Sequence, residues 1–148
     1  MEYPDMLIRG MSNKEQCISE EGLVLPGAFQ FDKFDPKQNA VYCELSINWC
    51  DDDGAIEVAR NQINIRTGKP QFQAGLARLN RKMLDTNLKS YFDLNILRYE
   101  RKPIVEDKAN NIVENKYHGN LLLKNDVSKG IKKLIPNALA AMVGNDII

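Results

Sequence analysis

A strict alternation of apolar and polar residues from 41 to 49 constrains this fold more than any other feature of the sequence. The odd positions are apolar and the even positions are polar or aromatic, in the order Val41, Tyr42, Cys43, Glu44, Leu45, Ser46, Ile47, Asn48 and Trp49. A period of two over nine residues predicts a half-buried β-strand. Because this strand carries the only tryptophan, we expect the rest of the chain to pack around it.

The densest acidic cluster of the chain follows this strand, and it indicates the start of a helix. Asp53 can cap the helix N-terminus, where Asp51 and Asp52 also favour the positive end of the helix dipole. Apolar residues on one face predict a helix over about 54–66, and the Gly and Pro residues that follow predict its end.

The clearest helical pattern lies at the end of the chain. Its apolar residues form one continuous stripe, which consists of Val127, Ile131, Leu134, Ile135, Ala138, Leu139, Met142 and Val143. Asp126 can cap this helix, and Pro136 is expected to kink or divide it on its polar face. The sequence therefore predicts a second helix, at the C-terminus, with one continuous apolar stripe.

The remaining segments predict an α+β domain. Further strands are expected over 6–10, 71–79, 88–99 and 117–123, with an edge strand or irregular arm at 23–31, a turn at 32–39 and a turn or short helix at 81–87. Short turns favour a mostly antiparallel sheet of about five strands, with the two helices packed on one face. The length predicts a single domain over 1–148, and the charged, Asn-rich stretch 102–115 predicts a flexible connection.

The charge distribution restricts the class of partner. The net charge is zero, which argues against a dedicated nucleic-acid or membrane binder, but residues 1–57 hold 12 acids and 4 bases whereas residues 58–148 hold 8 acids and 16 bases. This split indicates either two halves that attract each other within the fold or a polar surface for a partner. The three cysteines lack CxxC spacing, and no apolar run approaches the roughly 20 residues of a membrane helix, so we expect a cytoplasmic protein without membrane contact.

Two features are weak candidates for catalysis. His118 is the only histidine, and a single histidine can serve as a general base but excludes two-histidine metal or phosphoesterase sites. Asp51 and Asp53 have the oxygen ligands that Mg²⁺ or Ca²⁺ prefers, yet neighbours in sequence point in different directions and the helix start explains them. We therefore predict no metal, and the absence of Gly-rich phosphate-loop motifs predicts no cofactor.

The stretch from Arg60 to Lys82 contains no acidic residue and forms a basic surface. Its candidates for phosphate or nucleic-acid contact are Arg66, Lys69, Arg78, Arg81 and Lys82. Only Phe72 offers an aromatic ring in this stretch, which gives little support for base stacking. The alternative is a solvated face that balances the acidic N-terminal third.

Two hypotheses follow from these patterns. The first is a non-enzymatic cytoplasmic binding or accessory domain in a protein assembly, with a protein partner or self-association through 102–115 and the C-terminal helix. The second is a small enzyme or binder that acts on a nucleotide or nucleic acid, with His118 as base. In that case Asp51 or Asp53 and Arg78 or Arg81 must lie near His118 in one pocket.

Overall fold

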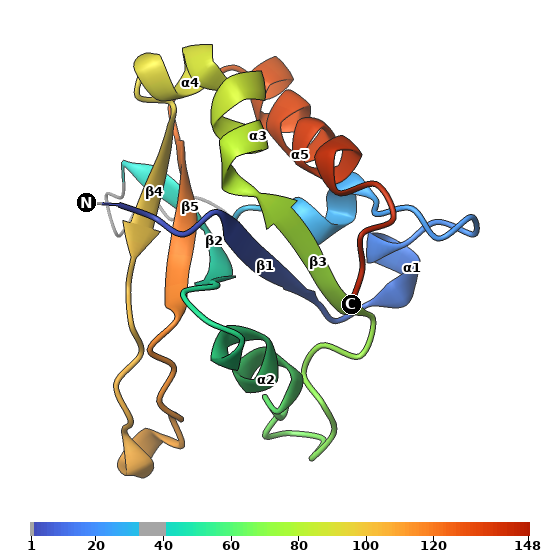
Figure 1. Cartoon of the computed structure of the whole chain (residues 1–148), viewed down its shortest axis with the longest axis vertical. Helices are drawn as coiled ribbons and strands as arrows, with labels where there is room; N and C mark the ends of the chain where they lie inside the picture. The colour runs from blue at the N-terminus through green and yellow to red at the C-terminus, as the bar shows by residue number, and fades with distance from the viewer. Residues whose placement is uncertain (1, 33–40) are drawn as a thin grey trace.

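A computed structural model describes residues 2–32 and 41–148 and has an α+β fold (Figure 1). The strands are β1 (Met6–Met11), β2 (Tyr42–Trp49), β3 (Gly75–Asn80), β4 (Leu97–Arg101) and β5 (His118–Lys124). The α-helices are α1 (Lys14–Cys17), α2 (Gly54–Arg60), α3 (Arg81–Asn87), α4 (Lys89–Asp93) and α5 (Lys129–Val143), and the 3₁₀ helices are η1 (Pro26–Phe29) and η2 (Lys108–Asn110). Most of the predicted turn at 32–39 lies outside the described residues.

The five strands form one antiparallel sheet in the order β3-β1-β2-β5-β4. The predicted central strand is confirmed, because β2 is the middle strand and pairs with β5 over seven residues. Its neighbour β1 pairs with it at only two positions, Leu7 with Trp49 and Ile8 with Asn48. Beyond that point the two strands diverge.

Arg9 bridges the two strands where they separate. Its Nη1 donates to Ser46 O and its Nε donates to Ala28 O, both at 2.9 Å. The bond to Ser46 O satisfies a β2 carbonyl group that the interrupted pairing with β1 leaves open, and the bond to Ala28 O joins β1 to η1. Burial lowers the pKa of the Arg9 guanidinium from its ordinary value, and no described carboxylate pairs with it.

The main core lies on the sheet face that carries the odd positions of β2. Leu45, Ile47 and Trp49 are buried there together with residues of η1, α3 and α5. A smaller cluster of Ile8, Ala59 and Leu76 includes a residue of α2 and one from each of β1 and β3. Figure 1 shows α3 and α5 together at one end of the sheet and α2 apart from them. The expected pair of helices on one face is not confirmed, since the described residues form five α-helices.

Several predicted boundaries are wrong for identifiable reasons. The helix predicted over 54–66 is shorter in the structure: α2 ends at Arg60, because the chain then turns into a short hairpin. Ser128 caps α5 in place of Asp126, and its Oγ accepts from Ile131 N at 3.3 Å. The helix continues through Pro136, so the C-terminal helix itself is confirmed. The arm at 23–31 contains η1, with Pro at the helix start.

The predicted strand over 88–99 is wrong in its first half. Residues 89–93 form α4, and only 97–101 form a strand. Asn95 adopts a left-handed conformation with φ 60°, which ends the helical turn and redirects the chain into β4. Leu94, which the alternation of such a strand would place on the same side as the buried Leu88, is 67% exposed.

Two hairpins extend the fold beyond the sheet. The long hairpin, residues 102–117, joins β4 to β5 through bridges between Ile104 and Asn115 and between Asp107 and Ile112. The short hairpin, residues 62–71, follows α2 and closes with a bridge between Ile63 and Pro70. Both lie at the lower end of the molecule in Figure 1. The predicted flexibility of 102–115 stays a prediction.

Ion pairs connect the acidic and basic halves of the chain. Four of the seven ion pairs among the described residues join residues 1–57 to residues 58–148, namely Asp5 with Arg81, Asp5 with Lys82, Glu44 with Lys102 and Asp51 with Arg101. The charge split therefore serves the fold at these positions. In the described part of the chain, every helix is too short or too polar to cross a membrane.

Candidate functional site

His118 lies at the start of β5 and lines a cavity of about 170 Å³. The other polar side chains around this cavity belong to Arg9, Ser46, Asn48, Gln62 and Asn115. The ring Nδ1 lies 2.7 Å from Lys102 O, so a neutral ring holds its proton on Nδ1 and keeps Nε2 as an acceptor. The cavity equals the liquid volume of about five or six water molecules. Ligand pockets usually measure about 300–1,000 Å³, so this one is too small for a nucleotide.

The predicted acidic and arginine partners of His118 do not line this cavity. Asp51, Asp53, Arg78 and Arg81 are all absent from its wall. The residues expected to share a substrate with His118 therefore do not share this cavity with it. The cavity offers one imidazole without a carboxylate to orient it, an arrangement that gives little support for general base catalysis.

Two buried asparagines in the cavity wall connect the segments around it by hydrogen bonds. Asn115 Nδ2 donates to Asn48 Oδ1 at 2.9 Å, and Asn48 Nδ2 donates to Ala55 O at 3.3 Å. Asn115 Oδ1 also accepts from Tyr117 N at 3.1 Å. The two amides thus fasten the base of the long hairpin to β2 and α2. The sequence carries no signal for this pair, since Asn115 lies in a stretch that reads as a polar loop.

The acidic cluster after β2 is held by hydrogen bonds within the fold. The Asp51 carboxylate accepts one hydrogen bond from each Nη atom of Arg101, at 2.7 and 2.9 Å, and these bonds lower the pKa of its carboxyl. Asp52 accepts from Tyr117 Oη at 2.6 Å and from Gly54 N at 2.8 Å, which lowers its pKa and raises that of Tyr117 to about 12. No group of three metal-ligating side chains occurs among the described residues.

The capping role assigned to Asp53 is wrong. Its side chain makes no capping hydrogen bond at the start of α2. Asp52 takes that role instead, because its carboxylate accepts from Gly54 N. The prediction that the acidic cluster begins a helix is confirmed, but the capping residue is Asp52 and not Asp53.

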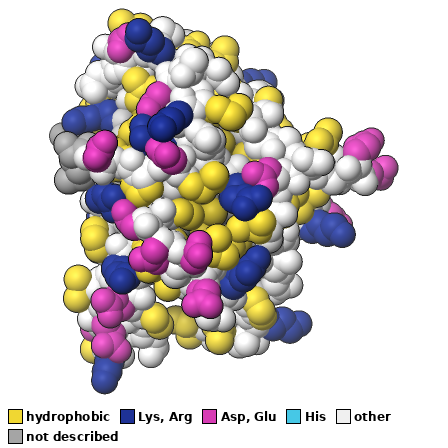
Figure 2. Space-filling view, viewed as in Figure 1, with side chains coloured by type: hydrophobic (Ala, Val, Ile, Leu, Met, Phe, Trp, Pro, Cys, Tyr) yellow, Lys and Arg dark blue, Asp and Glu magenta, His cyan; other side chains and the backbone are white. Residues whose placement is uncertain are grey.

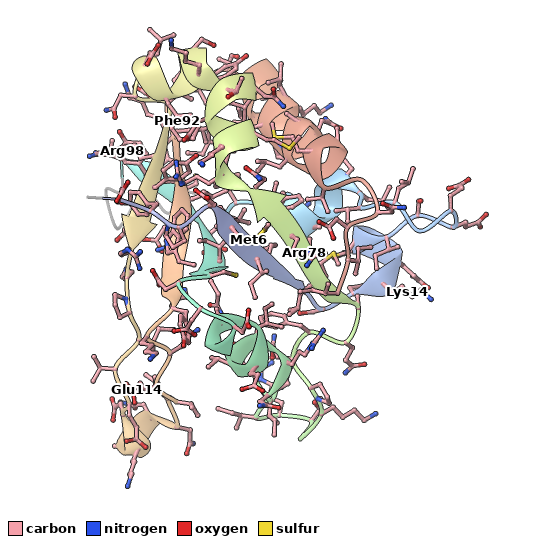
Figure 3. The ribbon with its side chains drawn as sticks, in the orientation of Figure 1. Met6, Lys14, Arg78, Phe92, Arg98 and Glu114 are labelled. Carbon is pink, nitrogen blue, oxygen red and sulfur yellow. The ribbon has the colours of Figure 1, made fainter. Side chains whose placement is uncertain are left out.

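The basic stretch divides into paired and unpaired cations. Arg78 donates twice to Asp146 Oδ1, at 2.6 and 3.0 Å, beside the C-terminal segment (Figure 3). Arg81 donates to Asp85 at 2.7 Å, and Lys82 lies 3.5 Å from Asp5. These three predicted phosphate contacts are therefore engaged by carboxylates.

The other cations of this stretch have no such partners. Arg60, Arg66 and Lys69 are exposed and form no ion pair with a described residue. Arg66 and Lys69 belong to the turn of the short hairpin, where Asn64 Oδ1 accepts from Arg66 N at 2.9 Å. Only this smaller group remains free to meet a partner.

The two hairpins carry an unusual share of exposed apolar side chains. Ten large hydrophobic residues are exposed in the described part of the chain, and five of them lie on the hairpins: Ile63, Ile65, Val105, Ile112 and Val113. Val105 and Val113 are 79% and 81% exposed. The bases of both hairpins meet at the cavity. Gln62 of the short hairpin and Phe72, which directly follows it, line one part of the wall, and Ile104 and Asn115 of the long hairpin line another. Sequence reasoning missed the short hairpin, although Gly68 and Pro70 mark its turn.

Comparison with models of protein families, with curated proteins and with solved structures gives no match to this chain.

Proposed function

We propose that this chain is a non-enzymatic binding domain that acts in a protein assembly and contacts its partner through the long and short hairpins. The observation that carries the proposal is the concentration of exposed aliphatic side chains on these two projections. Soluble monomers rarely expose contiguous apolar surface unless it serves an interaction. The hairpins lie at one end of the molecule, so one partner can contact both (Figure 1).

The apolar stripe of α5, which the sequence offers as a second docking surface, contributes less. Ile135, Leu139 and Val143 are buried in the core, and Leu134 is 42% exposed. The long hairpin, by contrast, has exposed valines on both of its strands, at positions 105 and 113. The proposed contact therefore lies at the hairpins alone. The cavity between their bases provides a recess where a partner side chain can be enclosed, as central interface residues often are.

The competing proposal, a nucleotide or nucleic-acid binder or enzyme, has narrower support. Its favourable observation is the unpaired group Arg60, Arg66 and Lys69. Against it stand the exposed carboxylates Asp53 and Glu57, which precede these cations in the same segment and would repel phosphate. We also propose a cytoplasmic location, because all three cysteines are free thiols and suit a reducing compartment.

Affinity capture from the native host tests the protein-binding proposal. The wild-type chain is compared with an Ile65→Lys, Val105→Lys variant and with Leu94→Lys, which changes an equally exposed leucine outside the hairpins. The free energies of unfolding of the three proteins should agree within about 0.5 kcal/mol, since the substitutions are at the surface. We expect specific proteins to be retained by the wild type and by Leu94→Lys and lost from the hairpin variant. Equal capture by all three would contradict the proposal.

A further inference from the structure

Arg9 brings a permanent positive charge to the wall of the cavity between the hairpin bases. Its bond to Ser46 O places the guanidinium in the gap between β1 and β2, and residues of both strands line the cavity. No described acidic residue belongs to the cavity wall. Burial lowers the pKa of the guanidinium, and Asp32, a described acid that acts on it, does so without an ion pair. The described fold therefore leaves this charge without a carboxylate partner.

The guanidinium also has hydrogen-bond donors to spare. Of the five N–H groups of an arginine, Arg9 uses one on Nε and one on Nη1 for backbone carbonyls. The remaining groups donate to no described residue. Ser46 and Gln62 are exposed parts of the same wall, and their side chains form no hydrogen bond within the described chain. The open side of the cavity thus presents one cation and several free polar groups.

We propose that this cavity binds a carboxylate of the partner, from an acidic side chain or a chain end, through Arg9. This inference rests on the proposed function and names the chemistry of the group that the partner inserts between the hairpins. A planar carboxylate matches the fork of a guanidinium and supplies the anion that a partly buried cation lacks. Figure 2 shows charged and hydrophobic side chains next to one another on the lower half of the molecule, where the hairpins lie. A polar anchor within an apolar contact suits such a surface.

The size and the charge of the cavity fit a carboxylate better than other groups. Its volume of about 170 Å³ equals about five or six water molecules, and an Asp or Glu side chain has about as many non-hydrogen atoms. A phosphate monoester carries a charge of about −1.5 to −2 at pH 7, whereas the described wall holds one permanent cation. An apolar side chain would leave the guanidinium donors unpaired, and a basic one would be repelled.

NMR of the full chain tests the site with acetate as the probe. His118 is the only histidine and lines the cavity, so its ring C–H signals report occupancy. Sodium acetate replaces sodium chloride at constant ionic strength and about pH 7.5. We expect a saturable shift with half-saturation at about 1–10 mM, a range that such a small ligand can reach. Methyl phosphate should need at least about ten times that concentration, because its second charge has no partner in the wall.

Gln62→Glu is the variant that carries the test. It places a carboxylate at the exposed side of the cavity and should weaken acetate binding about tenfold, because like charges then meet. Arg9→Gln is less informative, since it also removes the bonds that join β1 to β2 and η1. Gln16→Glu is the matched control, because it makes the same change at an exposed position of α1 outside the cavity wall. It should bind acetate like the wild type, and circular dichroism should give all these proteins the same folded spectrum.

Three outcomes of the titration would each overturn the inference. They are no saturable shift in the wild type, equal acetate affinity in Gln62→Glu, and tighter binding of methyl phosphate than of acetate.

Affinity capture then connects the site with the partner. Host proteins that the wild type and Gln16→Glu retain should be lost from Gln62→Glu, and equal capture by Gln62→Glu would overturn the inference. Failure of acetate to bind, with capture still lost in the Ile65→Lys, Val105→Lys variant, would remove this inference and leave the proposed function standing. Capture that ignores the hairpin substitutions would instead contradict the proposed function, whatever acetate does.

Discussion

At Gly119, near the start of β5, one added methyl group should strongly destabilise the fold. The indole of Trp49 lies over it, and Trp49 Nε1 donates to Glu100 O at 3.0 Å. A Cβ at position 119 would lie 2.6 Å from Trp49 Cδ1 and closer still to Nε1 and to the Glu100 carbonyl, which is tighter than real Cβ contacts. A backbone carbonyl and a fully buried indole must then move.

The expected cost of Gly119→Ala combines two effects. Overpacking a core costs about 1–3 kcal/mol, and loss of the indole hydrogen bond costs about 1 kcal/mol more. We therefore expect the free energy of unfolding to fall by about 2–4 kcal/mol. Urea unfolding followed by circular dichroism should show a lower midpoint with an unchanged slope. Gly130→Ala in α5 is the control, because its nearest neighbour is Ser128 Oγ at 3.8 Å and the substitution should stabilise the helix by up to about 1 kcal/mol.

A double-mutant cycle separates this contact from general damage to the strand. Trp49→Phe destabilises the core by itself, but it removes the indole nitrogen that Gly119→Ala displaces. The double variant should therefore lose less stability than the sum of the single variants, by about 1 kcal/mol or more. Strictly additive losses, or a loss of less than about 0.5 kcal/mol in Gly119→Ala, would refute the reasoning.

Two further predictions concern polar contacts near α2. Asp51 has its pKa lowered by Arg101, so the pair contributes stability above the unfolded pKa of about 3.9, and this contribution is lost as the pH falls through the folded pKa. Asp51→Asn should be less stable than the wild type by at most about 1 kcal/mol at pH 7, and this difference should vanish near about pH 2 in urea unfolding; a constant difference would contradict the assignment. Asn115→Ala leaves Asn48 Oδ1 and Tyr117 N without partners and should cost about 1–3 kcal/mol, with faster hydrogen exchange throughout the long hairpin. Unchanged exchange there would show that the amide pair does not anchor the hairpin.

The elements that sequence predicts well are those whose burial repeats along their own length. Leu45, Ile47 and Trp49 are buried because period two places them on one side of β2. Ile135 and Leu139 are buried because a spacing of four keeps them on one side of α5. In both elements a single periodicity fits the pattern, so the sequence determines the type of structure.

The strand predicted over 88–99 is partly wrong because the spacing of its apolar residues fits both a strand and a helix. Leu88 and Phe92 are four apart and share a face in a helix as well as in a strand. Ser90 between them breaks the alternation, and in α4 it no longer has to face the core. Asn95, a residue that tolerates the left-handed conformation, marks the real boundary. These two residues are the signals that favour the helix.

The contacts around the cavity and at the acidic cluster could not be predicted, since they join distant parts of the chain. Asn48 and Asn115 are 67 positions apart, and Asp51 and Arg101 are 50 apart. Each of these four side chains has an ordinary local explanation in a strand end, a loop or a helix start. Only the pairing of β2 with β5 and of β5 with β4 brings them together.

The alternation of β2 explains why the candidate contact lies where it does. Its odd positions fill the core, whereas Ser46 and Asn48 face the cavity on the other side. Polar side chains cannot be covered by apolar helices without losing hydrogen bonds, so this face is covered only in part, by α2 and the bases of the two hairpins. The hairpins then extend past the sheet, and the exposed aliphatic groups at Ile65 and Val105 find no described core residue to pack against. One face of β2 thus builds the core, whereas its other face is covered only in part and borders the hairpins with their exposed apolar side chains. For this reason we place the proposed contact at the hairpins.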